Sequence, residues 1–130
     1  MKTILESKTI LEGNFAIAEM VHGKKLDGMF VMCPVPPIIS NSTWIGYTEY
    51  SAHFHESYEW QAVALEFILK LGYEYTINSF YRNGNPTHIC SIKRQNSVSV
   101  ANNSSETSCA NAIFFALVEF ANLYNSKKLV

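Results

Sequence analysis

The sequence is short of charged residues, and this scarcity bears on how the chain meets its surroundings. Lys, Arg, Asp and Glu make up 16% of the 130 residues, and the formal net charge is −1. Globular domains usually carry about a quarter charged residues. We therefore expect part of the surface to be covered by self-association. A net charge near zero also supplies no field that would attract nucleic acid or an anionic membrane.

Other absences argue against whole classes of protein. No apolar run reaches the roughly 20 residues that a membrane-spanning helix needs, and residues 1–13 lack the apolar core of a signal peptide, so we expect a cytoplasmic protein. The three cysteines, Cys33, Cys90 and Cys109, have no CxxC spacing, which favours reduced thiols over a disulfide framework. No GxSxG, HExxH, P-loop or GxGxxG pattern is present. The sequence leans against an enzyme and indicates no cofactor.

The clearest element that is present is an amphipathic helix between Ser57 and Gly72. Ser57 is a good N-cap for its first turn, and Gly72 suits a helix end that needs a positive φ. Apolar residues between them recur at three- and four-residue steps and form one stripe. The stripe consists of Trp60, Val63, Ala64, Phe67, Ile68 and Leu71. Since strand-like sequence follows, we expect this helix to pack on a sheet.

The residues after this helix alternate in the way typical of antiparallel strands. The expected strands are residues 73–81, 87–93 and 97–101. Asn83-Gly84 lies between the first two and favours a hairpin turn. The alternation leaves open whether the face of Ile89 or the face of Cys90 meets the helix. The predicted fold class is α+β: an antiparallel meander of three to four strands, packed against two long helices and a short N-terminal helix as an α/β sandwich.

Residues 108–125 predict the second long helix, which is apolar on nearly every side. Ile113 and Leu117 lie on its core stripe, whereas Phe115 and Val118 point to its polar side. A helix of this kind is buried on more than one face. We therefore expect a homo-oligomer whose interface includes Phe115 and Val118.

The N-terminal third is less regular. Asn14–His22 predicts a short helix capped by its first residue, and residues 1–12 leave an edge strand, a short helix and a mobile arm open. Residues 29–50 include three prolines, which exclude a helix and a central strand there. Extended wrapping over the core is the simplest interpretation of that segment. No linker or repeat divides the chain, so residues 1–130 are expected to form a single domain.

One candidate site is a cleft with aromatic walls and a few polar anchors, as small-ligand pockets have. Its expected lining is Trp44, Tyr47, Tyr50, Tyr81 and Arg82. The competing interpretation is that most of these aromatic side chains pack the core. Aromatic and basic residues beside the hairpin also raise the question of nucleic-acid binding. No basic stripe continues from them, so a nucleic-acid partner is not expected.

A second candidate is a metal centre made from two pairs of residues. His53 and His55, like His88 and Cys90, are two positions apart, and in a strand such residues point to the same side. Four ligands of these types suit tetrahedral zinc. The spacing is not that of a known zinc module, and the alternative uses His55 at the helix cap and Cys90 in the core. On balance we expect no metal.

Several short motifs, in this order and spacing, resemble the phage ABA-sandwich domain, a family of small phage and prophage proteins. The segment His55-Glu56-Ser57-Tyr58-Glu59-Trp60, with Val63, Leu65 and Glu66, resembles the family's H-x-S-x-[DE]-W…V-x-E helix start. Asn14-Phe15-Ala16-Ile17-Ala18-Glu19 is similar to its N…IAE helix. Thr107, Ala112, Ile113, Ala116 and Leu117 are similar to its T…A-I…AL helix. The chain departs from the family in having His22-Gly23-Lys24 where Gly-Trp is usual, and in lacking a proline in the central helix.

The resemblance covers roughly residues 11–125 and implies a sheet with helices packed against it and a viral or prophage origin. It implies no activity and no catalytic residues. We therefore expect a non-enzymatic accessory protein that binds a small molecule, and in a concrete version a counter-defence protein that sequesters a nucleotide immune signal in the host cytoplasm. A protein–protein interaction module that inhibits a host defence or metabolic enzyme is the alternative. A small nucleotide-acting enzyme comes third.

Overall fold

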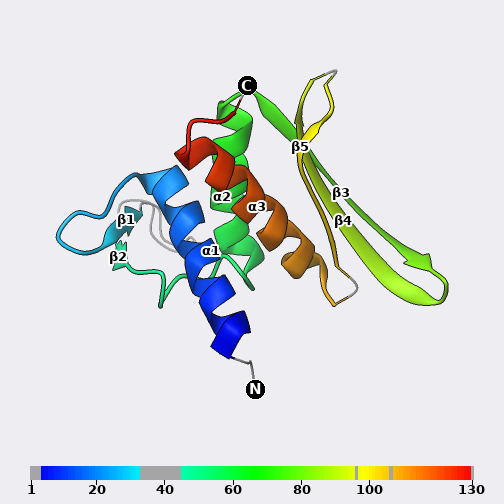
Figure 1. The fold of residues 1–130 in the computed structure, drawn as a ribbon, viewed down its shortest axis with the longest axis horizontal. Helices are drawn as coiled ribbons and strands as arrows, with labels where there is room; N and C mark the ends of the chain where they lie inside the picture. Colours follow the sequence, from blue (N-terminus) through cyan, green and yellow to red (C-terminus); the bar gives the residue numbers. More distant parts are fainter. Residues whose placement is uncertain (1–3, 33–44, 96, 106, 130) are drawn as a thin grey trace.

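The computed structural model describes residues 4–32, 45–95, 97–105 and 107–129. The elements are α1 (Ile4–His22), β1 (Phe30–Met32), β2 (Ile45–Tyr47), α2 (Tyr58–Lys70), β3 (Tyr73–Arg82), β4 (Asn85–Arg94), β5 (Ser99–Ser105) and α3 (Cys109–Asn125). The strands form an antiparallel pair β1-β2 and an antiparallel sheet in the order β3-β4-β5. The α+β class is confirmed (Figure 1). No helix in the described part of the chain is long and apolar enough to cross a membrane.

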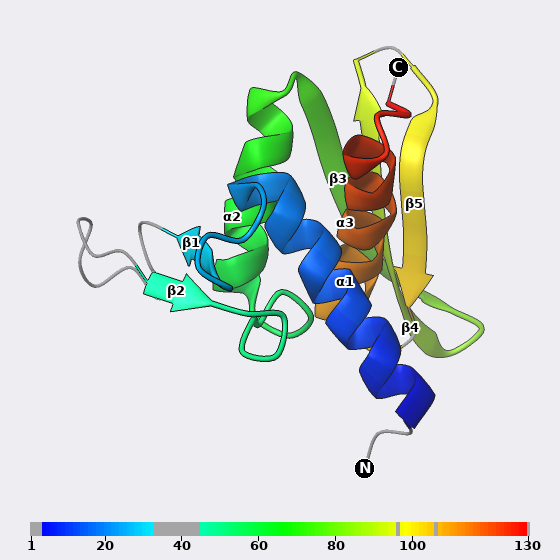
Figure 2. The same ribbon diagram turned by 60° about the vertical axis from the view of Figure 1, so that its left-hand side comes forward.

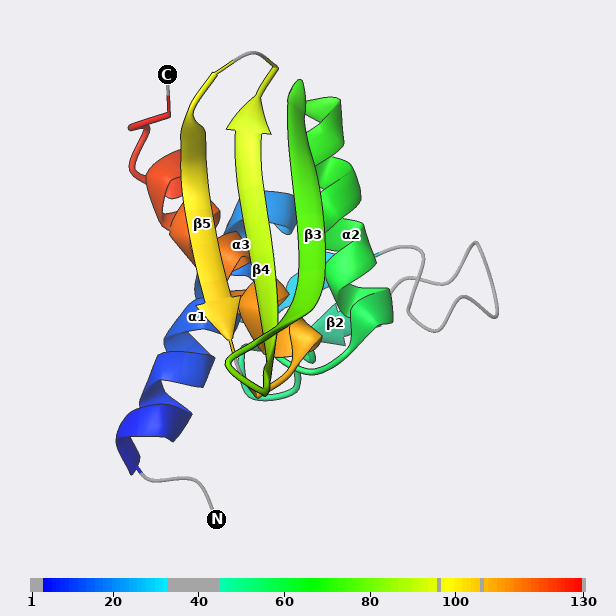
Figure 3. The ribbon, with the colours of Figure 1, turned by 90° about the vertical axis from the view of Figure 1, so that its right-hand side faces the viewer.

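The helices and the larger sheet are stacked in three layers. The sheet packs against α2 and α3, and α1 packs on α3 from the opposite side. Figure 2 shows α1 crossing in front of the other two helices, with the sheet behind them. Figure 3 looks onto the other face of the sheet, which no described element covers. The pair β1-β2 lies beside α1, far from the turn that joins β3 to β4 (Figure 1).

The helix α2 follows its local sequence signals closely. The Ser57 hydroxyl accepts a hydrogen bond from the Trp60 amide at 3.4 Å, as predicted for an N-cap. Gly72, with φ +93°, allows the turn into β3. Three residues differ from the predicted stripe. Leu71 is 37% exposed because it lies past the last helical turn, whereas Gln61 and Leu65, which were not in the stripe, are buried.

The hairpin of β3 and β4 also confirms its prediction. The two strands pair from Tyr73 with Arg94 to Arg82 with Asn85, and both turn residues have positive φ, 53° at Asn83 and 81° at Gly84. The face that meets the helices is the one that carries Cys90 and Ile92, both fully buried. The structure thereby decides a question that the alternation leaves open.

The strand β5 extends beyond the expected 97–101 to Ser105, into residues that are polar and weak strand formers. Two contacts compensate for the low propensity. The strand pairs with β4 as far as Ser105 with His88, and Asn103 Nδ2 donates a hydrogen bond of 2.7 Å to Glu119 of α3. The pairing partner and the helix, rather than the strand's own sequence, hold this segment extended.

The N-terminal helix is longer than predicted. It begins at Ile4. Of the edge strand, short helix and mobile arm that the sequence left open for residues 1–12, residues 4–12 therefore form helix. Asn14 is therefore not an N-cap but lies in mid-helix, where it is 1% exposed. The residues before it are mostly good helix formers, and a capping residue starts a helix only where the preceding residues leave the helical conformation.

The extra length of α1 explains why α3 is apolar on nearly every side. One side of α3 packs on β4 and β5, and the other packs on α1. At their crossing, a Cβ added to Gly13 would lie 2.5 Å from Phe114 Cζ and 2.8 Å from Val118 Cγ2, so the helices approach closely only because residue 13 has no side chain. Phe115 and Val118 pack against the core of their own chain. The helix that covers α3 is α1. The apolar character of α3, from which an oligomer interface at Phe115 and Val118 was expected, therefore does not require a second subunit.

Candidate functional site

The structure does not assemble the predicted aromatic cleft. Tyr47 is 4% exposed and packs in the core, with its ring 5.0 Å from that of Trp60. Tyr50 and Tyr81 are both 78% exposed. Tyr81 and Arg82 lie at the free end of the β3–β4 hairpin, well away from β2 in Figure 1. Trp44 lies outside the described residues.

The four candidate metal ligands do not come together either. His53 and His55 lie in the turn before α2 with stacked rings 6.5 Å apart, and each has its own partner: His53 Nδ1 lies 3.0 Å from Glu56, and His55 Nδ1 accepts from Asn14 at 3.1 Å. His88 shares a hydrogen bond of 2.7 Å with Ser79. Within the described ranges, no group of three or more His, Cys, Asp or Glu residues could hold a metal ion.

Three groups, two of them buried and His22 partly buried, have strongly shifted pKa values, and in each case burial disfavours the charged form. Burial lowers the pKa of His22 to about 4 and raises that of Tyr47 above its ordinary value. The two share a hydrogen bond of 2.7 Å. Burial, assisted by Cys109, raises the pKa of the Cys90 thiol to about 12. Cys90 therefore lacks the thiolate character that a nucleophile needs, and His22 stays neutral at pH 7.

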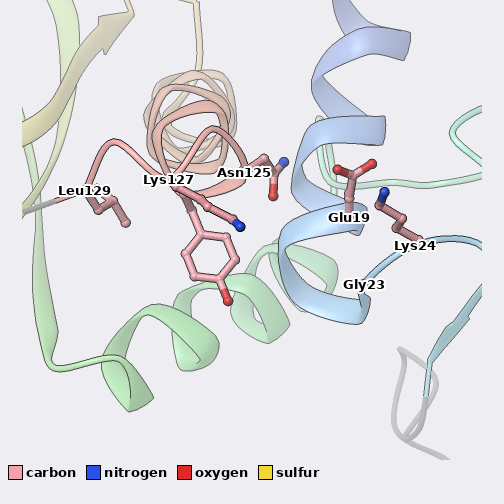
Figure 4. Close-up of a pocket in the computed structure, with 7 residues that line it drawn as sticks. Glu19, Gly23, Lys24, Asn125, Lys127 and Leu129 are labelled. Atoms are coloured by element: carbon pink, nitrogen blue, oxygen red, sulfur yellow. The ribbon is translucent and has the colours of Figure 1, made fainter.

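A hollow of about 500 Å³ lies between the C-terminal ends of α1 and α3 (Figure 4). We call it the end pocket. Its lining is Glu19, Gly23, Lys24, Tyr124, Asn125, Lys127 and Leu129. Figure 4 shows Glu19 and Lys24 on the α1 side and Asn125 and Lys127 on the α3 side, with Leu129 lying beyond Lys127, farther from α1. The pocket combines two ammonium groups, one carboxylate and an aromatic ring that is 36% exposed.

Local hydrogen bonds set the shape of the end pocket. Asn125 Nδ2 donates to the carbonyl of Ala16 at 3.0 Å and ties the end of α3 to α1. After α3 the chain turns through Lys127, with φ +60°, and the amide of Lys128 donates to Leu123 at 2.8 Å. This backbone arrangement satisfies helix-end carbonyls. It also carries Lys127 into the pocket opposite Lys24.

Two further hollows continue from the end pocket along α1. The middle pocket, about 510 Å³, shares Glu19 and Asn125 with it and also contains Lys8, Leu11, Glu12, Phe15, Ala16, Glu49, Tyr50 and Asn122. The inner pocket, about 210 Å³, is lined by Ile10, Leu11, Asn14, Glu49, Tyr50, Ala52 and His55. The charge changes sign along this row. The end pocket has two ammonium groups and one carboxylate, whereas the middle pocket has three carboxylates and one ammonium group.

Two of the predicted site residues line these pockets: Tyr50, expected in the aromatic cleft, and His55, considered as a metal ligand. The other lining residues were not predicted. Lys24 and Lys127 each follow a helix end, and cations are common there because they interact favourably with the helix dipole. That signal places each lysine beside its own helix but does not bring the two helix ends together. The buried position of Asn14 was missed because the residue was interpreted as a cap.

Comparison with models of known protein families, with curated proteins and with solved structures finds no match.

Proposed function

We propose that this chain is a non-enzymatic protein that binds a small molecule, and that the end pocket holds the ligand. The observation that carries the proposal is that Lys24, Lys127 and the partly exposed ring of Tyr124 line one pocket. The volume of about 500 Å³ lies within the range of roughly 300–1,000 Å³ that is typical of ligand sites. Two ammonium groups suit an anion, and the face of Tyr124 suits a planar ring.

A nucleotide has both features, which supports the more specific version of the proposal. In that version the chain is a phage or prophage accessory protein that sequesters a nucleotide immune signal in the host cytoplasm. The base would stack on Tyr124 and the phosphates would lie between Lys24 and Lys127. The phage origin rests on the resemblance of short motifs to the phage ABA-sandwich domain. The choice of ligand rests on the charge and the ring at the end pocket.

The competing explanation for the two lysines is electrostatic support of the helix ends. The C-terminal ends of α1 and α3 converge at this pocket, and each carries a partial negative charge that a nearby cation offsets by about 0.3–1 kcal/mol. Helix support predicts a lower stability when the lysines are neutralised. It predicts no dependence of ligand binding on them.

The two explanations separate in a binding experiment with matched variants. A panel of linear and cyclic nucleotides is titrated against the wild-type chain, the double variant Lys24→Gln/Lys127→Gln and the control Lys128→Gln, whose lysine does not line the pocket. Calorimetry should detect a nucleotide that binds the wild type and the control, and that loses about tenfold or more in affinity to the double variant. If no nucleotide binds, or if all three proteins bind equally, the proposal is wrong.

A second function is favoured by one observation, the exposed end of the hairpin. We define the hairpin surface as Ile77, Phe80 and Tyr81, which are 38%, 38% and 78% exposed. Exposed apolar side chains often mark a contact with another protein, and here they lie on both faces of the strand: Ile77 and Tyr81 on one, Phe80 on the other. This supports the alternative of a module that inhibits a host enzyme. It also supplies a place for the predicted homo-oligomer that does not use Phe115 or Val118.

This alternative has its own test. Retention of a host protein on the immobilised wild-type chain, and its loss with Phe80→Ser/Tyr81→Ser, would support the inhibitor. A change of sedimentation coefficient in the same variant would support self-association. If neither property changes, the hairpin surface has no such role.

A further inference from the structure

Asn14 presents a buried polar atom for which the described part of the chain provides no partner. Its side-chain nitrogen donates to His55 Nδ1 at 3.1 Å and more weakly to the carbonyl of Ala52 at 3.5 Å. Its oxygen Oδ1 accepts no hydrogen bond within the described residues. Buried polar atoms in folded proteins almost always have a hydrogen-bond partner, from the protein or from a bound molecule. An acceptor of this kind in a residue that lines a pocket indicates a donor bound there.

The other polar groups of the inner pocket indicate the charge of that donor. Glu49 lines the pocket with Asn14, and its carboxylate accepts a hydrogen bond of 2.8 Å from Lys25. Burial raises the pKa of the Glu49 carboxyl, but hydrogen bonds from Lys25 and from its own backbone outweigh that effect. The pKa is therefore lower than usual, and the carboxyl remains ionised. Tyr50 adds an aromatic ring that is 78% exposed, and aromatic rings attract cations.

The adjoining middle pocket has the same preference. Its carboxylates are Glu12, Glu19 and Glu49, and its one ammonium group, on Lys8, lies 3.9 Å from Glu12 in an exposed pair. The middle and inner pockets share Leu11, Glu49 and Tyr50, so they adjoin one another. The inner pocket, at Asn14, is the smaller of the two, and the middle pocket contains the other two carboxylates.

We propose that the inner and middle pockets bind an aliphatic di- or polyamine. One ammonium group donates to Asn14 Oδ1 and lies beside Glu49 and the ring of Tyr50. The methylene chain passes Leu11, and the next ammonium group lies among the carboxylates of the middle pocket. This site takes a ligand of opposite charge to the end pocket, and it does not depend on the proposed function there.

The test uses putrescine and spermidine as probes, at constant ionic strength, with calorimetry and melting temperature as readouts. Tyr50→Ala and Tyr81→Ala form a matched pair, since both tyrosines are 78% exposed and only Tyr50 lines the pockets. Spermidine should bind the wild type and Tyr81→Ala equally, and Tyr50→Ala about threefold more weakly. Glu49→Gln should weaken binding by about tenfold. Asn14→Leu should bind no amine.

Three results would overturn the proposal. The first is absence of binding to the wild type, which would show that Asn14 holds a water molecule only. The second is equal binding by Tyr50→Ala, Glu49→Gln and the wild type, which would show unspecific attraction to acidic residues. The third is equal binding of sodium and spermidine at matched ionic strength. If Asn14→Leu fails to fold, Tyr50→Ala and Glu49→Gln still decide between these outcomes.

Discussion

The crossing of α1 and α3 and the hairpin surface differ in how tightly the fold constrains them. At the crossing, Gly13 lies against Phe114 and Val118 with no room for a methyl group. At the hairpin surface, Tyr81 is largely exposed and Phe80 is partly exposed, with the Arg82 guanidinium over its ring at 5.2 Å. Substitutions at the crossing should therefore change stability, and substitutions at the hairpin should change only contacts with other molecules.

The largest expected effect is that of Gly13→Ala. Helix propensity alone predicts that this change stabilises α1 by about 1 kcal/mol. The new methyl group would instead meet the Phe114 ring, which is 1% exposed and has little room to move. Overpacking of this kind typically costs about 1–3 kcal/mol. An approach of 2.5 Å corresponds to the upper end of that range, so after the gain in helix propensity we expect a net loss of about 2 kcal/mol in the free energy of unfolding, measured in urea. A gain in stability would show that α1 is not held against α3.

A smaller loss is expected for Phe115→Glu, which separates packing within the chain from an interface between chains. Phe115 is half-buried, and its ring lies 5.1 Å from that of Phe114. Replacing it by a charged group should lower the free energy of unfolding by about 1–2 kcal/mol and leave the sedimentation coefficient of the folded protein unchanged. If Phe115→Glu instead dissociated an oligomer without changing the free energy of unfolding, the oligomer interface predicted from the sequence would be supported.

Acid should weaken the fold through His22. Its pKa is about 4 in the folded chain and 6.5 in the unfolded chain, so between these values the unfolded state binds more protons. The contribution of neutral His22 is complete above pH 6.5 and declines as the pH falls from 6.5 to 4. Allowing for its partial exposure, we expect a loss of about 1–2 kcal/mol. The free energy of unfolding, measured at pH 7 and pH 4.5, should fall less in His22→Gln than in the wild type. An equal fall in both proteins would show that His22 is not the cause of the acid sensitivity.

The smallest effect on stability is expected at the hairpin surface. Phe80→Ser should lower the free energy of unfolding by no more than about 1 kcal/mol, since the ring is only partly covered. Thermal unfolding of this variant beside Gly13→Ala compares the two regions directly. A loss for Phe80→Ser as large as that for Gly13→Ala would mean that the hairpin end belongs to the core.

The elements that sequence analysis predicted correctly are those whose signals are local. Ser57 and Gly72 mark the two ends of α2, and Asn83-Gly84 marks the hairpin, because each acts on the backbone within a few residues. The predicted start of α1 was wrong because an asparagine can either cap a helix or lie buried within one. The helix-forming residues before Asn14 argue against a cap, and its contacts with His55 and Ala52, which are distant in sequence, hold it in the buried position.

The candidate sites show the same limit. Tyr47 and Tyr81 are equally suitable for a cleft by composition. Only the packing of Tyr47 against His22, Phe30, Phe54 and Trp60 decides that it is buried while Tyr81 is exposed. Lys24 and Lys127 lie near opposite ends of the chain. They line one pocket because α1 packs on α3, and that contact was not predicted, since nothing in the local sequence of either helix names its partner.

The central claim, that the end pocket holds an anionic small molecule, is tested most directly by native mass spectrometry. The protein is purified from cells that contain nucleotide signals and is measured before and after denaturation. We predict a mass excess on the native chain that denaturation releases as a nucleotide and that Lys24→Gln/Lys127→Gln lacks. A wild-type chain that carries no ligand, and takes up none from a nucleotide panel, would contradict the claim and favour the hairpin surface as the functional part of the molecule.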